Sequence, residues 1–151
     1  MTSVANAFDP RTVLLAKHAQ HVVLVHFPIA LFLTGVVFGW AGQWTKREAL
    51  AEAGYYNLLV AAASTLPVLV TGVLAWRFQL EGQRLKGTLL VHLLLGCTSS
   101  VLIWAVWWLH RTARRRCAAL PRSRVLLEGV AMLTVALTGH LGGFLSGVNG
   151  G

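Results

Sequence analysis

Charged residues are scarce in this chain of 151 residues. Asp, Glu, Lys and Arg together make up 12% of it, and hydrophobic residues make up 56%. A soluble domain usually carries about 25% charged residues. The mean hydropathy is +0.64. These values exclude a soluble enzyme and a disordered tail, and they favour a membrane protein with a single domain, residues 1–151.

Acidic residues and cysteines are also few. The chain has five acids, and the only one inside an apolar run is Glu128. This scarcity argues against a proton-driven transporter and against a di-iron carboxylate site. Of the two cysteines, Cys97 is expected within a membrane span and Cys117 in a loop on the reducing side, so we expect no disulfide. The sequence contains no nucleophile–base pair and no phosphate-binding glycine loop.

Long apolar runs are what the chain has in abundance. A bilayer core about 30 Å thick requires about 20 apolar residues in a helix. Four runs meet this length, and short polar connections between them indicate neighbouring antiparallel helices. We therefore predict an all-α fold, an integral membrane four-helix antiparallel bundle. The predicted spans are about 22–44, 55–76, 88–110 and 125–147.

Basic residues give the net charge of +8. Because they gather between apolar runs, we interpret them as a topology signal and not as a nucleic-acid surface. Eight lie on the side of the first and third connections, against five on the other side. This predicts that both termini are periplasmic, in a multi-pass protein of the bacterial inner (cytoplasmic) membrane surrounded by lipid. The eight are Lys46, Arg47, Arg111, Arg114, Arg115, Arg116, Arg122 and Arg124, and the five are Arg11, Lys17, Arg77, Arg84 and Lys86.

Histidines are the main ionisable groups in the predicted spans. His26, His92 and His140 lie in three different spans, at similar depths of about 6–10 Å below the outer surface. His18 and His21 lie just above the first span on the same side. His110, which ends the third run beside Arg111, is expected at the inner interface without a role in a site. Ionisable groups inside a bilayer are costly and are candidates for function.

Imidazole is the commonest metal ligand and a frequent axial ligand of haem. Facing helices of a four-helix bundle are a usual place for such cofactors. We therefore expect these histidines to bind either haem b or a copper or zinc ion. The alternative is that they only form hydrogen bonds between helices. Basic side chains in the outer loop either pair with haem propionates or are solvated. The candidate ligands are His21, His26, His92 and His140, and the candidate basic partners are Arg77 and Arg84.

Two segments carry a family resemblance. His18-Ala-Gln-His21 followed by His26-Phe-Pro28-Ile, and Thr138-Gly-His140-Leu-Gly142-Gly143, resemble the opening and closing motifs of domain of unknown function 2231, a bacterial four-helix membrane family. Members typically have proline after both early histidines, where this chain has Ala19 and Val22. Links between family members and Rieske-type or cytochrome c modules imply electron transfer.

The functional hypothesis is a small membrane b-type cytochrome with one or two haem b groups in the periplasmic half of the bundle. It would pass electrons between the quinone pool and a periplasmic carrier, as an electron-transfer subunit of a larger oxidoreductase complex. The alternatives are a histidine-rich copper- or zinc-binding membrane protein and a structural subunit without a cofactor.

Overall fold

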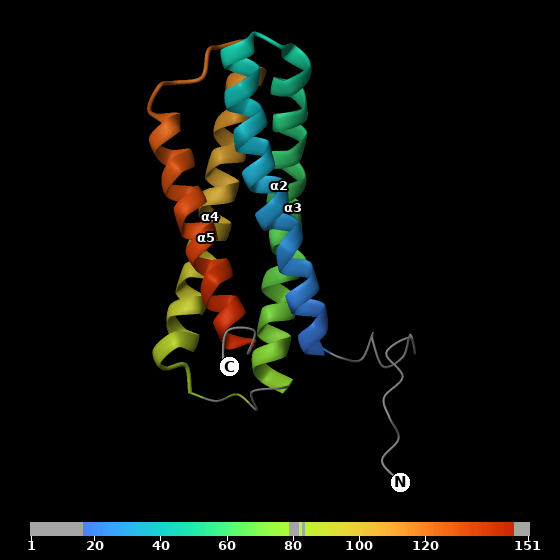
Figure 1. The fold of residues 1–151 in the computed structure, drawn as a ribbon, viewed down its shortest axis with the longest axis vertical. Coiled ribbons are helices and arrows are strands. Elements are labelled where there is room, and N and C mark those ends of the chain that lie inside the picture. Colours follow the sequence, from blue (N-terminus) through green and yellow to red (C-terminus); the bar gives the residue numbers. More distant parts are fainter. Residues whose placement is uncertain (1–16, 79–81, 83, 147–151) are drawn as a thin grey trace, which may run out of the picture.

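The computed structural model describes residues 17–78, 82 and 84–146. The described residues form four long helices and no strand. These helices run side by side in alternating directions (Figure 1). Each helix is long and apolar enough to cross a membrane. The prediction of an all-α membrane four-helix bundle is confirmed. The helices are α2 (Lys17–Thr45), α3 (Glu48–Phe78), α4 (Gly87–Arg115) and α5 (Arg124–Leu145).

The bundle has two ends, each formed by a different set of helix termini and connections (Figure 1). One holds the start of α2, the α3–α4 connection and the end of α5, and the other holds the α2–α3 and α4–α5 connections. We call them the outer and the inner end, following the predicted orientation. Because the helices alternate in direction, the first residues of α2 and α4 lie at the outer end together with the last residues of α3 and α5.

Helices α2, α3 and α4 extend beyond the predicted spans. The first connection, expected from Thr45 to Gly54, is only Lys46 and Arg47, because α3 already begins at Glu48. Residues 48–53 are Glu-Ala-Leu-Ala-Glu-Ala, all of high helix propensity, so the helix continues outside the apolar run. The fourth span was predicted to end at 147, whereas α5 ends at Leu145 and 147 lies outside the described residues.

Small residues allow α2 and α3 to pack closely. A Cβ on Gly54 would lie 2.8 Å from the backbone nitrogen of Gly39 and 2.9 Å from the carbonyl oxygen of Gly35. Gly35-x-x-x-Gly39 therefore forms a groove on α2 that receives the backbone of α3. Such grooves favour helix association in membranes, where packing replaces the hydrophobic driving force.

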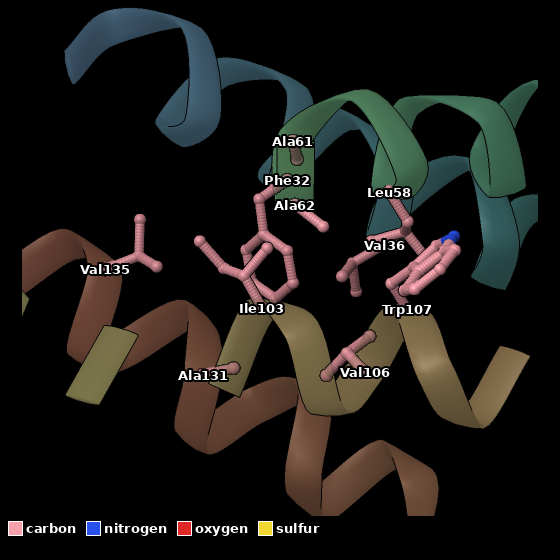
Figure 2. Packing of buried hydrophobic residues seen from close by; sticks show 10 residues of the cluster. All are labelled: Phe32, Val36, Leu58, Ala61, Ala62, Ile103, Val106, Trp107, Ala131 and Val135. Atoms are coloured by element: carbon pink, nitrogen blue, oxygen red, sulfur yellow. The ribbon is translucent and has the colours of Figure 1, made fainter. Parts of the chain in front are cut away.

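All four helices contribute to one apolar core, shown in Figure 2. Trp107 lies near the end of a predicted span, and such a position favours an interfacial anchor. In the structure it is instead a core residue with 5% of its surface exposed. Outside the core, large apolar side chains cover the bundle surface, as expected for contact with lipid. The core residues are Phe32, Val36, Leu58, Ala61, Ala62, Ile103, Val106, Trp107, Ala131 and Val135.

Candidate functional site

The packing of α5 on α2 sets the depth of the histidines. A Cβ on Gly139 would lie 3.4 Å from Cδ1 of Ile29, so these two residues are level. His26 lies one turn from Ile29 toward the outer end, and His140 directly follows Gly139 in the same direction. At 1.5 Å per residue, their backbones lie about 4.5 Å and about 1.5 Å from the shared level.

The third histidine lies in the same layer. The His92 ring packs against α5, where a Cβ on Gly142 would meet its Cε1 at 3.2 Å. Gly142 is three residues beyond Gly139, which is about 4.5 Å along α5. His26, His92 and His140 thus come from three helices and lie within about one helical turn of depth. We call these three residues the histidine layer.

His26 has a defined tautomer. Its Nδ1 lies 2.7 Å from the carbonyl oxygen of Val22, one turn earlier in α2. Because a carbonyl oxygen only accepts, Nδ1 is the donor, and in the neutral ring Nε2 then keeps a lone pair. The side chain is exposed. A histidine whose Nδ1–H is held by a backbone carbonyl is oriented in the way that metal-binding histidines usually are.

His92 and His140 differ from His26 in their surroundings. Nδ1 of His92 is buried and has no hydrogen-bond partner among the described residues, while the ring interacts with the backbone of Thr138. A buried polar atom in this state costs free energy unless something binds it. His140 is exposed. The layer therefore offers one oriented imidazole, one buried imidazole nitrogen without a partner, and one exposed imidazole.

His21 lies closer to the outer end than the histidine layer. Its Nδ1 is 3.2 Å from the hydroxyl oxygen of Thr71 on α3, and its ring fills the space beside Gly72. The Thr71 hydroxyl donates to the carbonyl of Pro67 at 2.9 Å, so its oxygen is the acceptor for His21 Nδ1–H. His21 is thus fixed to α3, as His92 is packed on α5.

The basic candidates lie at the same end. Arg77 is exposed in the last turn of α3, and a Cβ on Gly82 would lie 3.6 Å from its Nη1. Arg84 is exposed just before α4. The backbone of His18 belongs to α2, but its side chain lies outside the described part of the structure.

The donor set bears on which cofactor fits. Among the described residues, no three histidine, cysteine or acidic side chains lie close enough together to hold one metal ion. Haem requires only one or two protein ligands. An oriented imidazole on His26, Nδ1 of His92 without a hydrogen-bond partner among the described residues, and basic side chains at the outer end are the kinds of group that haem b takes as ligands and propionate partners.

The inner end contains a buried polar network that the sequence analysis missed. Nε2 of His110 lies 2.7 Å from Oε1 of Glu128, and the Trp40 indole donates to Oε2 at 2.5 Å. Glu128 is 1% exposed and His110 is 7% exposed. His110 lies near the inner end of α4, as expected, but its side chain faces Glu128 inside the bundle, because α4 and α5 pack face to face here and close over the pair.

An arginine completes this network. Nη1 of Arg124 lies 4.0 Å from Oε1 of Glu128, one turn along α5, and Nη2 donates to the side-chain oxygen of Gln43 on α2. Arg124 is 4% exposed. A buried carboxylate is tolerated when it is paired and hydrogen-bonded, as Glu128 is. We call Trp40, Gln43, His110, Arg124 and Glu128 the inner network.

Comparison with protein families now identifies the chain. A family model described as predicted membrane protein (DUF2231) matches residues 17–150. The chain belongs to this family. The match covers all four helices and both ends of the bundle. Neither the search of curated proteins nor the search of solved structures found a match.

In this DUF2231 protein, two signals pointed to the inner network. Glu128 is the only acid in an apolar run, so it needed a buried partner, and Arg124 lies one helical turn before it. His110 lies at the inner end of the neighbouring helix. Residue spacing alone, however, does not indicate which face of α4 meets α5.

Proposed function

We propose that this protein is a small membrane b-type cytochrome that binds haem through the histidine layer. His26 is the first ligand, and His140 or His92 is the second. The protein then passes electrons between the quinone pool and a periplasmic carrier, as a subunit of a larger redox complex. Bound haem would supply one-electron transfer, while the chain supplies ligands, burial and charge pairing.

The observation that carries the proposal is the hydrogen bond from His26 to Val22. At 2.7 Å it fixes the ring orientation and leaves Nε2 as an acceptor on an exposed side chain. A histidine with a purely structural role between helices would bond to a neighbouring helix instead. His26 bonds to its own helix through Nδ1, which is the arrangement of a ligand held ready.

The depth of the other two histidines supports a partner ligand. His140 and the His92 ring lie within about one helical turn of His26, on helices α5 and α4. His92 Nδ1 is buried and has no partner among the described residues. Arg77 and Arg84 lie at the outer surface on the same end, where they would pair with propionates.

An absorption spectrum tests the proposal. Protein purified from cells supplied with haem precursor should show a Soret band and, after dithionite, sharp α and β bands. A pyridine haemochrome assay should give one or two haem b per chain. Protein without porphyrin would contradict the proposal, and copper or zinc in metal analysis of the same sample would favour a metal site.

Variants test the ligand assignment. His26→Gly should lose the low-spin spectrum, and added imidazole should restore it by taking the place of the missing ring. His110→Gln is the matched control, because it changes a histidine at the other end and keeps a donor for Glu128. Full haem content without rescue in His26→Gly, or equal loss in His110→Gln, would exclude His26 as a ligand.

A further inference from the structure

A pocket of about 470 Å³ opens at the inner end between α3 and α4. Three of its lining residues are arginines, two are aromatic and one is aliphatic. A smaller pocket of about 210 Å³ adjoins it and shares Arg111 and Arg115. The lining residues of the larger pocket, which we call the arginine pocket, are Tyr55, Leu59, Trp107, Arg111, Arg114 and Arg115.

Aromatic rings position the guanidinium groups of this pocket. Arg111 lies 5.1 Å from the centre of the Trp107 ring, and Arg114 lies 4.4 Å from the centre of the Tyr55 ring. Stacking on a ring holds a guanidinium group by its face and leaves its N–H edge for an anion.

Positive charge in the pocket exceeds the available acid. Arg114 pairs with Glu52 at 3.6 Å, and both side chains are about half exposed. Within the described part of the chain, neither Arg111 nor Arg115 forms an ion pair. The pocket therefore retains positive charge that an anion would neutralise.

A residue that lines the pocket also carries a buried donor without a hydrogen-bond partner among the described residues. Trp107 lines it and is 5% exposed, yet its indole nitrogen is buried and makes no hydrogen bond to any described residue. Buried indole N–H groups normally have an acceptor. An oxygen of a ligand in this pocket would provide one once the Trp107 ring, or Arg111 that lies over it, moves to uncover the nitrogen.

We propose that the arginine pocket binds the phosphate of an anionic phospholipid, such as phosphatidylglycerol or cardiolipin. The phosphate would contact the arginines, and the acyl chains would lie on the apolar surface of α3 and α4, where Leu59 begins the apolar wall. Basic pockets between membrane helices on the cytoplasmic side suit such headgroups. Val60 on α3 and Val101 on α4 are exposed farther along these helices, which gives the chains an apolar path.

Native mass spectrometry of the full-length protein in detergent tests this proposal. Equal amounts of phosphatidylglycerol and phosphatidylcholine are offered, and phosphatidylglycerol should be retained preferentially. Arg111→Gln/Arg114→Gln should reduce that preference by about tenfold or more. Arg47→Gln/Arg122→Gln is the matched control, because it removes the same charge from exposed positions at the same end and should keep the preference.

Three outcomes would overturn the proposal. They are equal retention of the two lipids by the unchanged protein, equal loss in the control, and displacement of the lipid by millimolar glycerol phosphate, which would indicate a soluble phosphate ligand. If the double glutamine variant does not fold, Trp107→Phe replaces it, because phenylalanine keeps an aromatic ring and removes the indole donor. Trp107→Phe should weaken the preference several-fold, and an unchanged preference would contradict the proposal.

Discussion

Glu128 at the inner end and the histidine layer at the outer end differ in their hydrogen-bond partners. At the inner end, the Glu128 carboxylate accepts from His110 and Trp40 and is closed off from the surface. In the histidine layer, His26 bonds to its own helix, and Nδ1 of His92 has no partner among the described residues. Both carboxylate oxygens of Glu128 thus have hydrogen-bond partners, whereas Nδ1 of His92 has none among the described residues. Two nitrogen atoms at the inner end, Nη1 of Arg124 and Nε1 of Trp107, likewise make no hydrogen bond to the described residues.

This difference separates structural polar groups from candidate ligands. A buried polar group that stabilises a fold is hydrogen-bonded to other parts of the fold. A cofactor ligand must be oriented while its binding atom stays without a hydrogen-bond partner. Such a residue therefore contributes less to the stability of the fold. We therefore expect variants of the inner network to change the free energy of unfolding, and variants of the histidine layer to change cofactor content.

The largest effect is expected for Glu128→Leu. Removing the carboxylate leaves Arg124 as a buried charge and removes the acceptor of His110 and Trp40. Breaking a buried pair in this way costs about 3–5 kcal/mol. The free energy of unfolding can be measured by titration with SDS in mixed micelles. Glu52→Gln is the control, since this half-exposed acid should contribute under about 1 kcal/mol; equal losses would contradict the assignment of the inner network.

Glycine substitutions should show the next largest effect, and they compare close packing at the two ends. Gly54→Ala places a methyl group 2.8 Å from the Gly39 backbone, which cannot move aside. Gly142→Ala meets the Cε1 atom of His92 at 3.2 Å, and a side chain can rotate. Overpacking costs about 1–3 kcal/mol, so Gly54→Ala should lie at the upper end of this range and Gly142→Ala at the lower.

Gly129→Ala is the control for both glycine variants, because nothing lies within 4 Å of its added methyl group. Its free energy of unfolding in the same SDS titration should equal or exceed that of the unchanged protein. A greater loss in Gly142→Ala than in Gly54→Ala would reverse the comparison, since the histidine layer would then be the more tightly packed region.

The sequence predicted the four helices and the common level of His26, His92 and His140 along the bundle. Helices must match the bilayer thickness, and the rise per residue is constant, so depth follows from counting residues along each run. The rotation of each helix about its axis does not follow from counting. Because of that rotation, His110 faces Glu128 inside the bundle, whereas His140 is exposed.

A smaller effect is expected for Ser99→Ala. The Ser99 hydroxyl lies 2.9 Å from that of Thr138 and joins α4 to α5 between the two ends. Hydrogen bonds between membrane helices contribute about 0.6 kcal/mol on average, and the SDS titration should show a loss of that size. Ser100→Ala is the control, because this hydroxyl bonds only within its own helix, to Gly96 at 2.8 Å. If Ser99→Ala lowered the free energy of unfolding by more than about 2 kcal/mol, a polar contact outside the inner network would also be a major contributor to stability.

The smallest change in stability is expected for His26→Ala in protein without cofactor. The side chain is exposed and its hydrogen bond lies within α2, so alanine, the best helix former, should change the free energy of unfolding by less than about 0.5 kcal/mol. The same variant should lose most of its haem when the cofactor is supplied. A loss of stability comparable to that of Glu128→Leu would make His26 a structural residue and would remove the distinction between the two ends. A small loss of stability together with loss of haem is the pattern of a ligand, because only the cofactor-loaded state depends on Nε2.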